Sequence, residues 1–229
     1  MYEITIFTIV YNGYGKFLPQ WLECVRKQNK RPGQIIVVLG KDHGVTDFPE
    51  DVKFIKSISN NMGKLRNKAI EAKKYDKCLY FSVDDELLPD ATIELERKFN
   101  QGYKVVGLKF NDLQTVGTRE TPEGVITPIR VGAVRESYIA ENKKWRGTNV
   151  PGWVAVDGSY LYEEIEIPNY PYLFKLRSMG LPMIQTDNIV ANYIRRDGSH
   201  GDIAVKENKF NDYAKEIDCW MEKLLKPKY

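Results

Sequence analysis

Three consecutive carboxylates, Asp84, Asp85 and Glu86, follow two residues after a short apolar segment at residues 78–81. Acids at the end of a buried strand repel one another and lose solvation, so they require a compensating partner. Hard divalent cations such as Mg²⁺ and Mn²⁺ prefer carboxylate oxygens, which makes the three acids a candidate metal site. The alternative is a charge cluster at the start of a helix whose first residue is Pro89, since acids favour the positive end of the helix dipole.

The elements that position these acids can be read from an alternation of short apolar segments and amphipathic helices up to about residue 110. We expect strands at residues 4–11, 35–39, 52–55, 79–81 and 105–110, and helices at residues 17–28, 62–72 and 91–99. This alternation is typical of an α/β fold with a mostly parallel, Rossmann-like sheet flanked by helices. Ligands of such sheets bind at the carboxyl ends of the strands, where we expect the acids.

The pattern changes from residue 111 onward. Residues 125–134 are expected to form a strand, the following stretch is irregular and aromatic, and residues 210–224 carry one apolar helical face. We expect that last helix to pack on the core, with partner binding as the alternative. The sequence therefore predicts one domain over residues 1–229, in which a smaller irregular or antiparallel half at residues 111–229 follows the parallel half at residues 1–110.

Bulk composition restricts the class of protein. The chain is 42% hydrophobic and 28% charged, and its net charge of +3 is too small to indicate nucleic-acid binding by itself. Three cysteines lie far apart without metal-ligand spacing, which favours reduced thiols and a cytoplasmic protein. The first residues lack a signal-peptide pattern, and no run of about 18 apolar residues predicts a membrane span.

Four segments in order carry a family resemblance. They are the strand at residues 5–12 that ends on Tyr-Asn, the helix and strand at residues 17–38, the helix start at residues 63–70 with Gly63 and Arg66-Asn67, and the acidic motif at residues 82–90. Together they resemble the family 2 glycosyltransferases of the GT-A fold, and residues 176–180 and 193–200 add a weaker fifth match. The resemblance implies a nucleotide-sugar-binding half at residues 1–110 and an acceptor half at residues 111–229.

The resemblance implies a metal-dependent enzyme that moves a sugar from a nucleotide-diphosphate sugar to an acceptor hydroxyl, with inversion. Mn²⁺ or Mg²⁺ would neutralise the pyrophosphate as it leaves. Asp85 is then the first choice for the direct metal ligand, and Asp84 would contact the ribose or support the metal site. His200 would complete the site, and its alternative is an exposed loop histidine.

The resemblance also implies nucleotide-sugar contacts from Thr8, Tyr11 and Asn12 at the first strand. The alternative for Tyr11 and Asn12 is an ordinary turn after a strand.

From the helix at residues 62–72, Arg66 would face the phosphates or hold the acids, Lys64 would add a second positive charge, and Asn67 belongs to the same motif. The alternative for Arg66 is a surface salt bridge of little energetic value.

Two positions depart from the family pattern. The family has a nucleobase-reading acid just after its second strand, where this chain has Leu39-Gly40, and Asp42 is the nearest acid. Ser82 stands in place of the first Asp of the usual acidic motif. The donor nucleobase therefore stays open.

An inverting reaction needs a carboxylate that deprotonates the acceptor hydroxyl. The family takes it from a Glu-Asp pair, but this chain has Asn169-Tyr170 at that spacing. Asp157 is the best substitute, because it ends an apolar run. Its rivals are Glu163, Glu164 and Glu166, for which the alternative is a solvated charge run.

The acceptor is the least defined substrate. Lys143, Lys144, Trp145 and Arg146, with Arg195-Arg196, combine basic and aromatic residues. This combination suits phosphate contacts and base stacking, as in a phage-type DNA-base (hydroxymethylpyrimidine) glycosyltransferase, and its alternative is a solvated basic loop. Saccharide or lipid-linked acceptors, a catalytically inactive sugar-nucleotide-binding relative, and a nucleotidyltransferase are the other readings.

Overall fold

The computed structural model describes residues 2–122, 125–136, 153–164, 169–195 and 219. Several predicted features lie outside these residues. They are the C-terminal helix, His200, Glu166, Arg196, and the basic segment Lys143, Lys144, Trp145 and Arg146.

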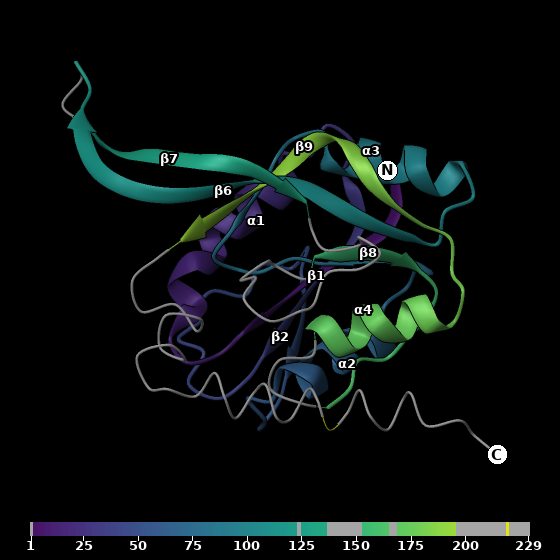
Figure 1. The fold of residues 1–229 in the computed structure, drawn as a ribbon. Helices are drawn as coiled ribbons and strands as arrows, with labels where there is room; N and C mark the ends of the chain where they lie inside the picture. Colours follow the sequence, from purple (N-terminus) through teal and green to yellow (C-terminus); the bar gives the residue numbers. More distant parts are fainter. Residues whose placement is uncertain (1, 123–124, 137–152, 165–168, 196–218, 220–229) are drawn as a thin grey trace.

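The described chain forms one nine-stranded mixed sheet with helices packed against it (Figure 1). The strands are β1 (Tyr2–Val10), β2 (Pro32–Leu39), β3 (Lys53–Lys56), β4 (Lys77–Tyr80), β5 (Glu86–Leu87), β6 (Val105–Glu120), β7 (Ile126–Glu136), β8 (Val154–Asp157) and β9 (Met183–Arg195). The helices are the 3₁₀-helix η1 (Tyr14–Phe17), α1 (Leu18–Arg26), α2 (Met62–Ala72), α3 (Ala91–Asn100) and α4 (Asn169–Ser178).

The N-terminal half is a parallel sheet in the order β3-β2-β1-β4. Helix α1 leads from β1 to β2 in one direction across the sheet, whereas α2 leads from β3 to β4 in the other. Right-handed connections therefore place these two helices on opposite faces. The predicted fold class, a Rossmann-like α/β sheet flanked by helices, is confirmed.

Buried apolar strands explain why this half forms. Every residue from Ile4 to Val10 in β1 and from Ile35 to Leu39 in β2 is buried, as expected for strands covered on both faces. Helix α1 adds Trp21, which is fully buried. The carboxyl ends of β1, β2, β3 and β4 lie at one edge of the sheet, so the loops that follow them converge there.

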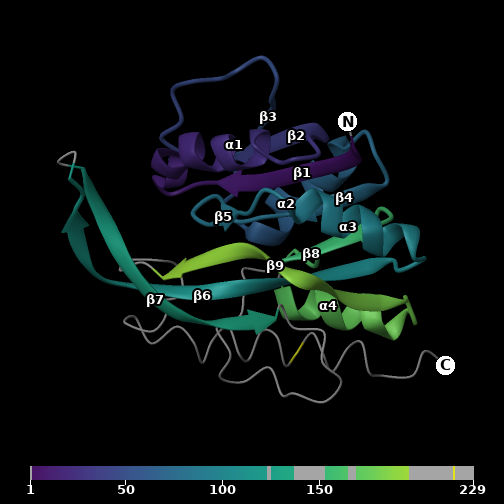
Figure 2. The same ribbon diagram turned by 90° about the horizontal axis from the view of Figure 1, so that it is seen from above.

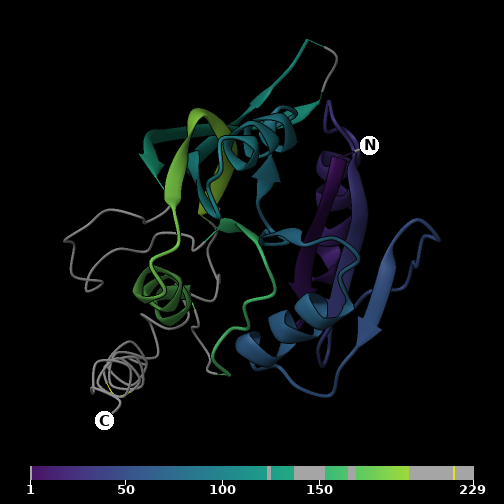
Figure 3. The same cartoon turned by 90° about the vertical axis from the view of Figure 1, so that its right-hand side faces the viewer.

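The second half continues the same sheet with mixed strand directions, whereas the prediction was an irregular or antiparallel half. Strand β8 pairs antiparallel with both β4 and β6, and β9 runs parallel to β6. Figure 3 shows the two halves from the side. Helix α3 packs on β6 and β9.

The prediction of about fifty irregular residues after residue 134 was wrong for β8 and α4, and the sequence did not predict β9, which follows that stretch. Strand β9 contains several polar residues that hide its strand character in the sequence. Tertiary partners satisfy them: Asn188 donates to Glu94 (2.7 Å), and Asn192 accepts from Asn111 and donates to Glu86.

Strands β6 and β7 form a long hairpin that runs out beyond the rest of the sheet (Figures 1 and 2). Its outer residues, from Thr115 to Glu120 in β6, are exposed. Within the described part of the chain, no helix has the length and apolar character needed to cross a membrane.

Candidate functional site

The acidic segment forms a turn directly after β4, at the carboxyl edge of the parallel strands. The Asp85 N–H donates to the Ser82 carbonyl (3.3 Å) and closes the turn. The Asp85 side chain is buried, and its Oδ1 accepts the backbone N–H of Ile194 in β9 (2.9 Å). Asp84 is half-buried beside it. The turn thus fixes one carboxylate on β9 and leaves its neighbour partly open to solvent.

Trp153 contacts Ser82, the residue at the position where the resemblance expects the first acid of the motif. Its indole Nε1–H donates to Ser82 Oγ (3.0 Å). The ring is fully buried and lies 4.6 Å from the Phe81 ring and 5.4 Å from the Phe110 ring, measured between centroids. Ser82 therefore anchors the first residue before β8 to the acidic turn, a contact that the sequence did not reveal.

Glu86 belongs to a strand, so the alternative of a charge cluster at a helix start is wrong for this acid. It pairs with Asn192 of β9 in β5, whereas α3 begins only at Ala91. Its carboxylate accepts from Gln20 of α1 (2.9 Å), Arg130 of β7 (2.9 Å) and Asn192 (3.1 Å). Glu86 therefore ties three elements to the acidic turn.

Tyr193 lies between the acidic turn and the end of β9. Its ring centroid is 6.0 Å from that of Trp153. Burial and the nearby carboxylates of Asp85 and Asp84 raise the pKa of Tyr193 to about 12, and Arg195 opposes the rise. The phenol therefore stays protonated at neutral pH and remains a hydrogen-bond donor beside the acids.

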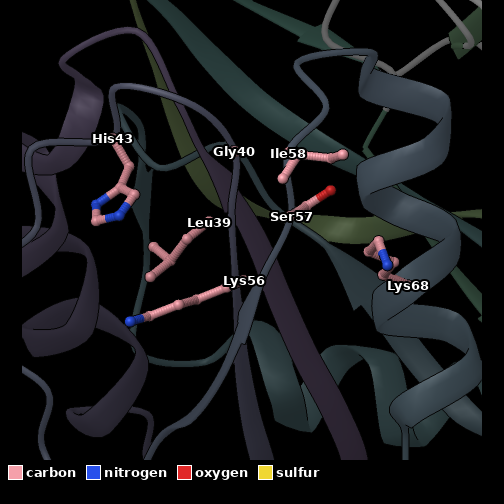
Figure 4. Close-up of a pocket in the computed structure, with 7 residues that line it drawn as sticks. All are labelled: Leu39, Gly40, His43, Lys56, Ser57, Ile58 and Lys68. Atoms are coloured by element: carbon pink, nitrogen blue, oxygen red, sulfur yellow. The ribbon is translucent and has the colours of Figure 1, made fainter.

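A pocket of about 460 Å³ opens at the carboxyl ends of β2 and β3, the same sheet edge as the acidic turn (Figure 4). It is lined by Leu39, Gly40, His43, Lys56, Ser57, Ile58 and Lys68. In Figure 4 the His43 ring and the Lys56 amino group lie on one side, and Lys68 projects from α2 on the other. The pocket thus combines an apolar floor with basic groups, a lining suited to a nucleotide.

The loops after β1 and β2 are held together at this pocket. Asn12 has left-handed backbone geometry (φ 48°), and its N–H donates to the Lys41 carbonyl (3.1 Å). The Asn60 amide bridges the two loops: it donates to Asn12 Oδ1 (2.8 Å) and accepts the Lys41 N–H (2.6 Å). Tyr11 stacks on Tyr14 with ring centroids 6.1 Å apart.

Gly40 stands close to where the family resemblance predicts a nucleobase-reading acid. A Cβ at this position would lie 2.7 Å from Asn60 Oδ1 and 2.9 Å from the Ser59 carbonyl oxygen, which leaves no room for a side chain. The next acid, Asp42, is exposed at φ 51°, and its carbonyl accepts the Gly13 N–H (2.6 Å). Asp42 therefore lies on the loop beside the pocket and outside its lining.

Thr8 does not reach these loops. It is fully buried within β1, and its Oγ1 has no hydrogen-bond partner among the residues that the structure describes. A direct nucleotide contact does not fit this placement, because the neighbouring strands cover the residue.

Arg66 is buried, which corrects both the predicted phosphate contact and the surface salt bridge. Its guanidinium stacks 3.7 Å from the Tyr80 ring centroid and donates to Asn169 Oδ1 at the start of α4. It therefore connects β4 to α4. Asn169, the residue that replaces the family's Glu-Asp pair, accepts this hydrogen bond.

Asn67 holds the segment before α4. Its side-chain amide donates to the Tyr162 carbonyl (2.9 Å) and accepts the Tyr162 N–H (2.7 Å). Both residues are buried, so the predicted nucleotide contact for Asn67 does not fit. One turn earlier on α2, exposed Lys64 pairs with exposed Glu164 (3.5 Å).

Asp157 lies at the wrong edge of the sheet for a base. Strand β8 is antiparallel to β4, with Lys77 opposite Asp157 and Leu79 opposite Ala155. Its first residues therefore lie near the acidic turn, whereas Asp157 reaches the amino end of β4 and pairs with Lys104 (2.7 Å). The structure separates Asp157 from Asp84 and Asp85 by the length of β4.

The acidic turn offers a donor set that fits Mg²⁺ or Mn²⁺. Asp84 and Asp85 supply hard carboxylate oxygens, and such ions take one or two carboxylates together with phosphate oxygens. Among the described residues, no group of three or more His, Cys, Asp or Glu side chains converges on one point. His200, the predicted third ligand, lies outside those residues.

The chain resembles solved structures of Staphylococcus aureus TarS, a glycosyltransferase, over residues 1–349 of that protein. The TM-score is 0.57 at 14% identity, over 84% of this chain and 60% of that chain. For the TarS complex with UDP-GlcNAc the TM-score is 0.60 at 15% identity, over 87% of this chain and 60% of that chain. For the complex with UDP the TM-score is 0.58 at 14% identity, over 86% of this chain and 61% of that chain.

No protein-family model matches the sequence, and no curated protein does. The chain spans about three fifths of the TarS chains that it resembles. At this identity the likeness concerns the fold: the chain has the mixed α/β fold of the glycosyltransferase TarS.

Proposed function

We propose that the protein is a metal-dependent glycosyltransferase that moves a sugar from a nucleotide-diphosphate sugar to an acceptor hydroxyl. The observation that carries this proposal is the placement of Asp84-Asp85 at the sheet edge that also holds the 460 Å³ pocket. A diphosphate between the pocket and the acids would have its nucleoside on one side and its sugar on the other. The UDP-GlcNAc and UDP complexes of TarS support this donor class.

We assign the nucleoside to the pocket at β2 and β3. Tyr11, Asn12 and Asp42 frame it through the loops after β1 and β2. Lys56 and Lys68 line the pocket and would offset the negative charge of the donor. Because Gly40 carries no acid, the nucleobase would be read by the backbone and by neutral side chains such as Ser57.

Asp84 and Asp85 would hold the divalent cation. Such an ion supplies electrostatic stabilisation of the leaving nucleoside diphosphate. The chain itself fixes Asp85 through the Ile194 N–H, so that the carboxylate needs no reorganisation when the donor binds.

Glu164 is our candidate for the base of an inverting reaction. It lies beside the first turn of α2, where Lys64 pairs with it, and its side chain is 58% exposed. An accessible carboxylate can accept the acceptor's hydroxyl proton as the oxygen attacks the anomeric carbon.

Donor hydrolysis tests the proposal, with UDP-GlcNAc as the first donor and Mn²⁺ present or chelated. We expect metal-dependent release of UDP, and we expect Asp85→Asn and Asp84→Asn to reduce its rate by about a hundredfold or more, as for loss of a transition-state charge contact. Asp47→Asn, in the exposed loop after β2, is the matched control and should keep the wild-type rate.

The proposal would fail if the protein bound nucleotides tightly but turned over no nucleotide sugar with any divalent metal. That result would identify a sugar-nucleotide-binding relative without transferase activity.

A further inference from the structure

A buried carboxylate on the second half of the sheet holds two arginines. Asp112 of β6 has a side chain only 4% exposed. Both of its oxygens accept from Arg195 of β9, from Nε and Nη2 at 2.7 Å each. Arg135 of β7 adds a third contact, with its Nε 2.7 Å from Asp112 Oδ2. Three strands thus contribute one charged cluster, the Asp112 cluster.

The charges of the Asp112 cluster do not balance. Two guanidinium groups share one carboxylate, which leaves a net charge of +1. Arg135 is 47% exposed and Arg195 is 43% exposed, and within the described part of the chain neither pairs with a second acid. Asp112 contacts Nε and Nη2 of Arg195 and Nε of Arg135, so among the described residues the remaining N–H groups are left for a ligand.

The Asp112 cluster lies next to the acidic turn along β9. The Ile194 N–H binds Asp85, and Arg195 is the next residue, a step of about 3.3 Å along a strand. Tyr193, on the other side of Ile194, is opposite Asp112 in the strand register. Because Tyr193 and Arg195 are two residues apart in a strand, their side chains share one face of the sheet.

We propose that Arg135 and Arg195 bind a phosphodiester of the acceptor, so that the acceptor substrate is a phosphodiester-containing molecule. This inference rests on the proposed glycosyltransferase function. Guanidinium groups match the geometry of phosphate oxygens, and carboxylate contacts hold these two in place before the ligand arrives. A net charge of +1 matches the single negative charge of a phosphodiester. The acceptor hydroxyl would then lie near Tyr193 and the acidic turn.

The test measures binding of defined probes to the full-length protein by calorimetry, with UDP and Mn²⁺ present. The probes are glycerophosphoglycerol, a single-stranded oligodeoxynucleotide, and maltotriose as a neutral acceptor. We expect at least one phosphodiester probe to bind, and the one that binds more tightly distinguishes a polyol-phosphate source from a nucleic-acid source. Arg135→Gln should weaken that binding by about tenfold or more, as for loss of a charge-assisted contact.

Arg135→Gln is preferred to an Arg195 variant because Asp112 keeps its two contacts with Arg195. Arg119→Gln is the matched control, since it removes the same charge from an exposed site on the same hairpin. Arg195→Lys provides a second variant that keeps the charge and loses the paired N–H geometry, and it should also weaken the binding.

The inference is overturned if no phosphodiester probe binds, if only maltotriose binds, or if Arg135→Gln and Arg119→Gln weaken binding equally. Donor hydrolysis separates this failure from failure of the proposed function. Wild-type protein that hydrolyses the nucleotide sugar but binds no phosphodiester probe would overturn this inference alone, whereas absence of hydrolysis by the wild type would remove the proposed function itself.

Discussion

Arg66 and Asn67 are adjacent polar residues whose side chains bind other parts of the fold. Both are buried in α2, and both bind the segment that leads into α4. A buried polar group that lacks a hydrogen bond is costly, and these two find partners about a hundred residues away. Their role is to fix α4 and the segment before it against α2.

Asn67→Ala should therefore destabilise the protein. The substitution leaves the buried N–H and C=O groups of Tyr162 without partners, at a cost of about 2 to 4 kcal/mol in the free energy of unfolding. Urea unfolding measures this difference, and Asn100→Ala at the exposed end of α3 should change it by less than about 0.5 kcal/mol. Equal effects of the two substitutions would show that the hydrogen bonds between Asn67 and Tyr162 do not stabilise the fold.

At the scale of elements, β9 organises the site although its sequence does not stand out. It pairs with β6 on one side and β5 on the other. Its backbone fixes Asp85, its Asn192 binds Glu86, and its Arg195 binds Asp112. One strand therefore carries contacts to the acidic turn and to the proposed acceptor subsite.

The ion pairs of Asp112 should make the anchoring of β7 and β9 depend on pH. The hydrogen bonds from Arg195 are the main cause that holds the pKa of Asp112 below its ordinary value. Arg135 lowers it further, and burial opposes both. A carboxylate whose pKa is lower in the folded state stabilises the protein above its unfolded pKa, near about 4, and loses that contribution as pH falls through the folded pKa.

Asp112→Asn should accordingly lower the free energy of unfolding by about 1 to 3 kcal/mol at pH 7, a range that allows for the solvent exposure of both arginines. The difference from wild type should shrink as pH falls below about 4, where the wild-type carboxyl also becomes neutral. Urea unfolding between pH 3 and 7 measures it. A difference that stays constant across this range would exclude the ion pairs as its cause.

At the scale of the whole molecule, β8 joins the two halves. It lies between β4 and β6 and pairs antiparallel with both. Trp153, just before β8, contacts residues from the acidic turn and from β9. The hydrophobic core is continuous from β1 through β8 to β6, so we expect the described halves to unfold together.

Cys78 of β4 reports on this cooperativity. It is buried at the pairing with β8, and burial raises the pKa of its thiol to about 12. Since the thiolate is the reactive form, Cys78 should resist thiol reagents until the sheet opens. In a Cys24→Ser, Cys219→Ser variant, labelling should follow the same urea transition as tryptophan fluorescence.

A matched variant that keeps only the exposed Cys219 should label in the folded state. Labelling of Cys78 at urea concentrations where tryptophan fluorescence is still native would mean that β8 detaches from β4 before the core unfolds.

The sequence by itself determined the parallel half and the place of its acids. Continuous apolar strands such as residues 35–39 have no stable position except inside a covered sheet, and the chain order puts Asp84-Asp85 after such a strand. Periodicity also predicted α2 at its observed bounds. These features are local, because a few neighbouring residues suffice to specify them.

Only the tertiary structure decided what the polar residues do. Asp157 ends an apolar run as a base might, but the antiparallel direction of β8 carries it to the other edge of the sheet. Asp112, Arg135 and Arg195 are scattered over three segments and form a cluster only through strand register. Register and strand direction arise from contacts between distant segments, and no local pattern encodes them.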